Sequence, residues 1–444
     1  MSNKRKELPE ETAEERAEET EEEPRRCDTC PERFIDGSKA VFVRFIATSL
    51  EAERIHDEGL SAFPAEFVHQ IFEPDGAIEC PPEERSMRVE VAYSAASLDY
   101  LVLPSGGGKA VTQAAQTLAA SLPQPPAAAV GGLVEATTSF APAGAVAGER
   151  IAQYARDGRS YEVYSAPLGA EAPPARLRFA ERLQSLFRFC IETSSAIDHG
   201  DERWRVVTIF EAPAGGEPYR LVAASTLFSF KRWLPRRGPV LLLRVCQVVT
   251  LPAFRSHGHG ARLLQAIYEL AGSLDAAEVT VEDPNDSFRL LRDRVDYRNA
   301  CERGLLPPES TDGPPSSEAV DDARSALRLT EEQCVRVHEM RQLAKLREAG
   351  GSVLAEEVIK PFRLLVKKRL AKKHKEELDA MLSLHVREEN NPAAGASSEG
   401  DAPPSREALV ALRKERLEAM WAELLAEYDA ALSVARAPAA TAVQ

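Results

Sequence analysis

The sequence predicts an α+β fold in which a mixed core lies between an α+β N-terminal domain and a helical C-terminal domain. Residues 245–281 contain, in order, a β-branched run, a glycine-containing loop, an amphipathic helix and a second strand. Two apolar runs upstream, 206–210 and 221–226, flank a glycine-containing turn, as paired antiparallel strands do. The pattern after residue 318 is helical. We therefore expect a sheet in the middle of the chain and helices at its end.

Composition limits the kind of partner. The chain has 444 residues, enough for two or three domains, and 44% of them are hydrophobic, so a sizeable core is expected. Its net charge of −15 argues against direct nucleic-acid binding and favours a basic partner. No signal peptide and no long apolar span is apparent, so no membrane partner is expected. Seven scattered cysteines predict a reducing, intracellular compartment.

The N-terminal part divides in two. Residues 1–37 are charged and poor in apolar side chains, which predicts a disordered acidic tail. Its single Cys-x-x-Cys, Cys27 and Cys30, lacks a second pair, so no metal is expected. Residues 38–165 are predicted to form an α+β domain with a low-complexity insert at 104–147. A glycine-rich stretch in the insert resembles a phosphate loop, but Ala110 stands where a magnesium-binding Ser or Thr is needed.

The remaining two domains follow from periodicity. Residues 175–306 are predicted to form the mixed core, beginning with a helix over 176–195 whose apolar residues share one face. After a linker, residues 319–436 are predicted to form a helical domain. Its basic cluster, 367–375, is interpreted either as a solvated helix face or as a nuclear localisation signal.

The most informative stretch is the loop at 255–261, Arg-Ser-His-Gly-His-Gly-Ala. Glycines let a backbone approach an anion closely, and free amides at a helix start donate hydrogen bonds to it. The strand at 278–281 then ends in Glu282, Asp283 and Pro284. This layout is suited to hold a pyrophosphate and to place a base beside it. The loop lacks the three-glycine spacing of a Rossmann fingerprint.

The loop fits the pattern Gln/Arg-x-x-Gly-x-Gly/Ala, with which GNAT acetyltransferases hold acetyl-CoA. The wider sequence resembles the type B histone acetyltransferase catalytic subunits, the Hat family, over about residues 40–385 with gaps. The stretches that carry this resemblance are 63–72, 88–93, 189–198, 201–204, 258–264, 282–284 and 291–293. It departs from the family at Arg255 and Ser256, where Gln and Gly are usual, and in the insert.

The resemblance implies an acetyl-CoA-dependent lysine N-acetyltransferase with a GNAT core and no metal. Glu282 matches the base position, with Asp283 beside it, and Glu192 assists catalysis or holds the substrate lysine. Trp204 and Glu192 match positions that line the substrate groove. The residues assigned to acetyl-CoA are Val248, Val249, Thr250, Arg255, Ser256, His257, Gly258, His259, Gly260, Ala261 and Ser287. A bulge near residues 248–250 is expected to free backbone groups for the cofactor.

Each assignment has a simpler alternative. Glu282 can merely end a strand, Glu192 can be a helix-face carboxylate, and Trp204 can be a core aromatic.

About one free lysine in a thousand is neutral at pH ~7.4, so deprotonation of the substrate lysine costs about 4 kcal/mol and a general base matters. Because a Glu of ordinary pKa, near ~4.3, is a poor base, we expect Glu282 to be partly buried. His257 and His259 are not expected to hold a metal, which would need further ligands, and His259 is expected to serve the structure of the loop.

The resemblance also implies substrates and partners. They are newly synthesised free core histones, chiefly histone four, and a WD-repeat histone-binding propeller, with the protein present in nucleus and cytoplasm. Direct attack in a ternary complex is expected, because Cys190 and Cys246 lie in apolar runs and make an acyl-cysteine unattractive. The alternatives are a GNAT enzyme that acts on another protein amine or a small amine, and a non-catalytic histone-binding scaffold.

Overall fold

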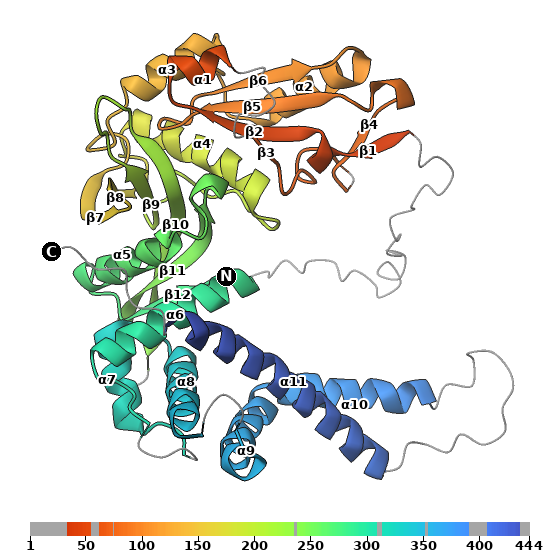
Figure 1. The fold of residues 1–444 in the computed structure, drawn as a ribbon, viewed down its shortest axis with the longest axis vertical. Coiled ribbons are helices and arrows are strands. Elements are labelled where there is room, and N and C mark those ends of the chain that lie inside the picture. The colour runs from red at the N-terminus through yellow and green to blue at the C-terminus, as the bar shows by residue number, and fades with distance from the viewer. Residues whose placement is uncertain are drawn as a thin grey trace, which may run out of the picture.

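The computed structural model describes residues 33–54, 62–73, 75–234, 238–308, 313–350, 354–389 and 406–435. Figure 1 shows a sheet-and-helix domain, a central sheet and a helical part, stacked along the long axis. The predicted α+β class is confirmed. Most of the predicted acidic tail, with Cys27 and Cys30, lies outside the described residues.

The N-terminal domain is built on a four-stranded sheet in the order β3-β2-β5-β6. These strands are β2 (Val41–Ile46), β3 (Phe63–Pro64), β5 (Arg88–Ser94) and β6 (Tyr100–Ser105). A two-stranded sheet pairs β1 (Phe34–Asp36) with β4 (Ala77–Glu79). The short helices are η1 (Gly37–Lys39), α1 (Ser49–Glu53) and η2 (Pro82–Glu84).

The low-complexity insert forms two helices, α2 (Lys109–Ser121) and α3 (Val130–Thr138). Alanine favours helix, and a few apolar side chains at helical spacing are enough to dock a helix on a sheet. Val111 and Leu118 of α2 and Leu133 of α3 are fully buried against the domain. The insert is therefore part of the folded N-terminal domain.

The central sheet has six strands in the order β12-β11-β10-β9-β8-β7. Its strands are β7 (Glu149–Arg156), β8 (Arg159–Pro167), β9 (Trp204–Glu211), β10 (Arg220–Leu234), β11 (Gly238–Thr250) and β12 (Glu278–Val281). The antiparallel pairing predicted for β9 and β10 is confirmed. Strands β7 and β8 lie within the sequence range predicted for the N-terminal domain, 38–165, yet β8 pairs with β9. By strand pairing, β7 and β8 belong to the central sheet, whose first strand begins at Glu149. The sequence did not reveal this, because local composition carries no information on which strands pair.

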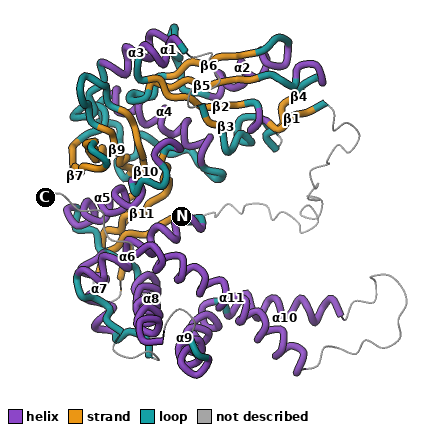
Figure 2. Tube along the Cα trace, in the orientation of Figure 1, coloured by secondary structure: helices purple, strands orange, loops and turns teal. Residues whose placement is uncertain are grey.

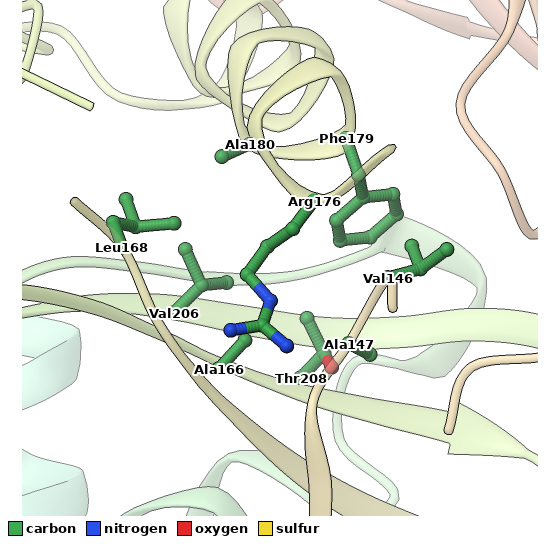
Figure 3. Close-up of a pocket in the computed structure, with 9 residues that line it drawn as sticks. All are labelled: Val146, Ala147, Ala166, Leu168, Arg176, Phe179, Ala180, Val206 and Thr208. Carbon is green, nitrogen blue, oxygen red and sulfur yellow. The ribbon is translucent and has the colours of Figure 1, made fainter. Parts of the chain in front are cut away.

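The two faces of this sheet are covered by different helices. In β9, Val206 and Phe210 face one core, while Val207 and Ile209 face the other, as strand alternation requires. Helix α4 (Pro174–Cys190) and the N-terminal domain cover the first face, and α5 (His259–Ser273) covers the second. Figure 3 shows Arg176, Phe179 and Ala180 of α4 over Val206 and Thr208 of β9.

The C-terminal part is helical, as predicted (Figure 2). Its helices are α7 (Ser317–Leu327), α8 (Glu331–Gly350), α9 (Glu356–Lys373), α10 (Lys375–Glu389) and α11 (Arg406–Ala435). Helix α6 (Asp286–Glu302) joins it to the core, since buried Asp293 accepts from Arg336 of α8. In the basic cluster, Lys367 pairs with Glu418 and Lys373 with Glu332. Among the described helices, none combines the length and apolar character that a membrane crossing requires.

Candidate functional site

The glycine loop joins β11 to α5 through η3 (Pro252–Phe254). Gly258 is the N-cap of α5, with φ +78°, and it provides no side-chain cap. The first amides of an α-helix have no partner within the helix and carry the positive end of its dipole. The loop therefore presents backbone donors to an anion, as its sequence predicts. The order of strand, loop, helix and strand predicted for the GNAT core is present as β11, the loop, α5 and β12.

Two glycines of the loop lie where no side chain fits comfortably. A Cβ at Gly258 would lie 2.5 Å from Nη1 of Arg156, and one at Gly260 would lie 3.2 Å from a methyl carbon of Leu291. Arg156 ends β7, about a hundred residues before the loop, and no local sequence signal marks it. Arg262, in the first turn of α5, stacks over Tyr154 at 5.6 Å. These two arginines add positive charge at the loop.

Arg255 and Ser256, the two departures from the family pattern, have different consequences. Ser256 has φ +64°, in the left-handed region that favours glycine, so the loop keeps its shape at a small conformational cost. Arg255, one of the residues assigned to acetyl-CoA, has its Nη1 2.6 Å from Oε1 of Glu66, and its Nε donates to the Thr250 carbonyl at 3.1 Å. Arg255 therefore ties the loop to the N-terminal domain.

The two histidines of the loop have structural surroundings, as expected. His259 is buried, and its Nδ1 hydrogen-bonds the Tyr154 hydroxyl at 2.6 Å. Burial lowers its pKa to about 4, so the ring is neutral near pH 7. His257 is exposed, and its Nδ1 donates to the Arg255 carbonyl at 2.8 Å. In the part of the chain that the structure describes, no cluster of three His, Cys, Asp or Glu side chains is arranged to hold a metal.

Strands β11 and β12 pair in parallel only up to the end of the short strand β12. Their last pair is Val245 with Val281, after which the Glu282 amide donates to the Val245 carbonyl at 2.9 Å. Strand β11 continues to Thr250, so five of its residues, Cys246–Thr250, extend beyond β12. The predicted bulge is present but lies earlier, at Cys246, which is left between two successive pairs with β10. Val248, Val249 and Thr250 thus lie on a stretch that β12 does not cover.

Glu282 directly follows the last residue of β12. Its side chain is 49% exposed, and its Oε1 lies 3.7 Å from Nη1 of Arg244. Partial burial was expected, and about half of the side chain is exposed because β12 ends at Val281, just before it. Burial, together with the neighbouring Glu282 carboxylate, raises the pKa of the Cys246 thiol to about 12. Asp283 is also exposed and has φ +34°.

Half-buried aromatic side chains lead from Trp204 toward Glu282. Trp204 lies 4.8 Å from Phe228, and Phe228 stacks on Phe230 at 6.3 Å, centroid to centroid. We call Trp204, Phe228 and Phe230 the aromatic strip. The guanidinium of Arg244 lies 4.9 Å from the Phe230 centroid. Phe228 and Phe230 were missed by the sequence interpretation, although their i,i+2 spacing along a long strand was a usable signal.

Glu192 follows α4 in an irregular segment. The predicted helix over 176–195 ends earlier, at Cys190, so Glu192 is not a helix-face carboxylate. Its side chain is exposed, and its carbonyl accepts from Gln70 at 3.1 Å. No hydrogen bond joins it to Glu282 within the described residues.

Buried Gln247 fixes this segment on the sheet. Its Nε2 donates to the Ser194 hydroxyl at 3.2 Å and to the Ser195 carbonyl at 2.9 Å. Its Oε1 accepts from Thr226 of β10 at 3.0 Å. Gln247, next to the bulge, was missed because a single polar residue in an apolar run does not reveal its partners.

Ser287 lies in the first turn of α6 and is exposed. The N-cap of this helix is Asn285, which accepts from the Phe288 amide at 2.9 Å. Leu291 of the same helix approaches Gly260, so α6 flanks the glycine loop. Ser287 therefore lies in the first turn of a helix that flanks the glycine loop.

Comparison with known proteins gives one consistent group. No protein-family model matches this chain. Proteins named histone acetyltransferase type B catalytic subunit do match it. The Candida albicans protein is 28% identical over 244 residues, which is 52% of this chain and 57% of the relative. The human protein is 28% identical over 200 residues, which is 44% of this chain and 46% of the relative.

The chain is related to type B histone acetyltransferase catalytic subunits. This confirms the resemblance that the sequence predicted. A third type B relative, from Schizosaccharomyces pombe, is 28% identical and covers 53% of this chain and 58% of its own length. The chain thus spans about half the length of the type B relatives that it matches.

Solved structures that overlap with this chain include acetyltransferase domains. The xEco2 acetyltransferase domain bound to a CoA conjugate is 10% identical, with a TM-score of 0.22, and the overlap covers 28% of this chain and 81% of that domain. An aminoglycoside acetyltransferase from an uncultured soil metagenomic sample is 14% identical, with a TM-score of 0.21, over 33% of this chain and 90% of its own.

Proposed function

We propose that this protein is an acetyl-CoA-dependent histone lysine N-acetyltransferase that acts on newly synthesised free histones, chiefly histone four. The observation that carries the proposal is that β12 ends at Val281, beside Val245, while β11 continues to Thr250 and leads into the glycine loop. An uncovered strand edge thus runs from the Glu282 end of β12 to the loop. The relationship to type B subunits supplies the substrate class.

The cofactor side of the proposal rests on shape and charge. A pyrophosphate fits the loop because Gly258 and Gly260 leave no side chain between the anion and the amides of α5. Arg156 and Arg262 supply compensating charge. An extended pantetheine chain can pair with the backbone of Val248 to Thr250, since β12 has already ended. No step in this arrangement calls for a metal.

The chemical step proposed for Glu282 is removal of a proton from the substrate lysine. The ammonium loses a proton to the carboxylate, directly or through one water, and its nitrogen then bonds to the acetyl carbon. The thioester C–S bond breaks, the acylated nitrogen gives up its second proton, and the CoA sulfur leaves as a thiol by gaining one proton, directly or through water. Glu282 is half exposed, so it can pass its proton to solvent after each turnover.

Cys246 is not a nucleophile in this proposal. Its pKa, raised to about 12, leaves the thiol protonated near pH 7, and the reactive form of cysteine is the thiolate. Attack by lysine on acetyl-CoA within a ternary complex needs no acyl-enzyme. Trp204 and the rest of the aromatic strip offer the aliphatic part of a lysine side chain a surface next to Glu282.

The proposed partners follow from the net charge of the chain and from its relationship to type B subunits. A free histone tail carries lysines among positive charges, which suits a chain of net charge −15. The same negative charge repels DNA. Binding to nucleosomal DNA depends on basic side chains that neutralise phosphates and release counterions, and an acidic chain is poorly suited to this. We propose work on soluble histones, in nucleus and cytoplasm, with a WD-repeat histone-binding propeller as partner.

Side-by-side rates on free histone four and on nucleosomes, with acetylated lysines mapped by mass spectrometry, test the proposal. We expect faster transfer to the free histone. Equal or faster turnover on nucleosomes would contradict the type B assignment. Transfer only to small amines would favour the alternative GNAT enzyme. Histone binding without any transfer would favour the scaffold.

A further inference from the structure

Arg244 is the positive charge nearest to Glu282 among the ion pairs of the described residues. It lies on β11, two residues before the bulge at Cys246. Its Nη1 is 3.7 Å from Glu282, and its guanidinium lies over the Phe230 ring at 4.9 Å. The ring and the carboxylate together orient the guanidinium at the end of the aromatic strip.

We propose that Arg244 favours the neutral, attacking form of the substrate lysine, because its guanidinium stands beside the proposed base. The inference rests on the proposed function and adds a residue to it. A like charge within about 4–6 Å disfavours the charged form of a titrating group. A lysine that reaches Glu282 along the aromatic strip brings its ammonium into this range of Arg244. Arginine remains protonated, so its charge is present throughout the pH range of the reaction.

The same charge helps to reset the base. A proton that Glu282 takes from the lysine must leave before the next turnover, and loss of that proton restores the ion pair with Arg244. Because the carboxylate is half exposed, the proton can leave to water. The proton therefore moves from lysine to Glu282 and on to solvent, and Arg244 neither gains nor loses one.

Few other groups titrate near this pair. Cys246 faces it from β11, and its thiol stays protonated because its pKa is about 12. Asp283 follows Glu282 at the end of β12 and is exposed. The neighbouring strand β10 contributes Phe228 and Phe230, which carry no charge, while Arg203 stacks over Phe228 at 4.8 Å and pairs with Asp201. The pH response assigned to this place thus belongs to Glu282 and the bound lysine, with Arg244 as the fixed charge.

The test is the pH dependence of kcat on a lysine-containing histone peptide, because kcat reports groups in the bound complex. Arg244→Met removes the charge and keeps a long side chain, and Arg244→Gln is a second neutral variant. Arg244→Lys keeps the charge. The control is Arg232→Met, which alters an exposed cation on β10, four residues from Phe228 and roughly 13 Å along the strand.

We expect the rising limb of kcat to move to higher pH by about one unit in both neutral variants. The sign follows because loss of the cation removes a like charge from beside the bound lysine, which then holds its proton more tightly. The limb should stay in place in Arg244→Lys and in the control. An unmoved limb in Arg244→Met and Arg244→Gln, or an equal movement in Arg244→Lys, overturns the inference. If the wild-type protein acetylates no lysine peptide, the proposed function fails instead.

Discussion

The glycine loop and the carboxylate end of β12 lie at opposite ends of the uncovered stretch of β11, and they are built in opposite ways. The loop binds with its backbone, so its design lies in a few consecutive residues around Gly258 and Gly260. The carboxylate end depends on side chains from three strands, with Glu282, Arg244 and Phe230 brought together by register. Backbone sites are therefore easier to recognise in a sequence than side-chain sites.

The largest expected effect is at the carboxylate end. Glu282→Gln should lower kcat by about 10²-fold or more and leave acetyl-CoA affinity unchanged, because it removes the base but keeps the shape. Asp283→Asn is the matched control, since it neutralises the adjacent exposed carboxylate. Steady-state rates at pH ~7 with calorimetric binding decide the matter. A larger loss in Asp283→Asn would transfer the role to that residue.

The second effect separates the loop from the base. Gly258→Val should weaken acetyl-CoA binding by about tenfold or more, about 1.4 kcal/mol, because valine resists φ +78° and its Cβ would displace the Arg156 guanidinium from the loop. Calorimetry on the folded variant measures it. Gly272→Ala is the control, because a Cβ there meets nothing within 4 Å. Unchanged affinity in Gly258→Val would remove the loop from the cofactor site.

A smaller effect tests how far the side-chain site depends on buried polar contacts. Gln247→Leu should lower the free energy of unfolding by about 1–3 kcal/mol, because it leaves the buried Thr226 hydroxyl without its partner and removes one of the two side-chain donors to the Ser195 carbonyl, the other being Gln184. Chemical denaturation measures the change. Gln113→Leu, at an exposed position of α2, should change stability little. Equal stability of the two variants would mean that Gln247 does not fix the segment.

The smallest effect concerns the link between the loop and the N-terminal domain. Glu66 and Arg255 are both partly exposed, so Glu66→Gln should cost at most about 1 kcal/mol of stability. It also releases Arg255, so acetyl-CoA should bind somewhat more tightly, by less than about tenfold, and more so at low salt. Calorimetry at two ionic strengths checks this. Weaker binding would mean that Arg255 must be held by Glu66 for the loop to work.

Prediction from sequence succeeded where a pattern was local. The loop, the amphipathic helix α5 and the strand before Glu282 were all visible in periodicity and in glycine positions. It failed where the answer lay in pairing. The domain boundary was placed after β8, which pairs with β9. The bulge was expected near Val248, yet it lies at Cys246, because register with β10 decides it.

The sequence by itself determined the backbone anion site and the position of a carboxylate at the end of a strand, because both depend on adjacent residues. Only the tertiary structure decided that Arg156 from β7 approaches Gly258, that Gln247 holds the segment after α4, and that Arg244 faces Glu282. The physical reason is that side-chain contacts depend on which strands pair and in which register. A shift of one residue would turn each of these side chains to the opposite face of the sheet.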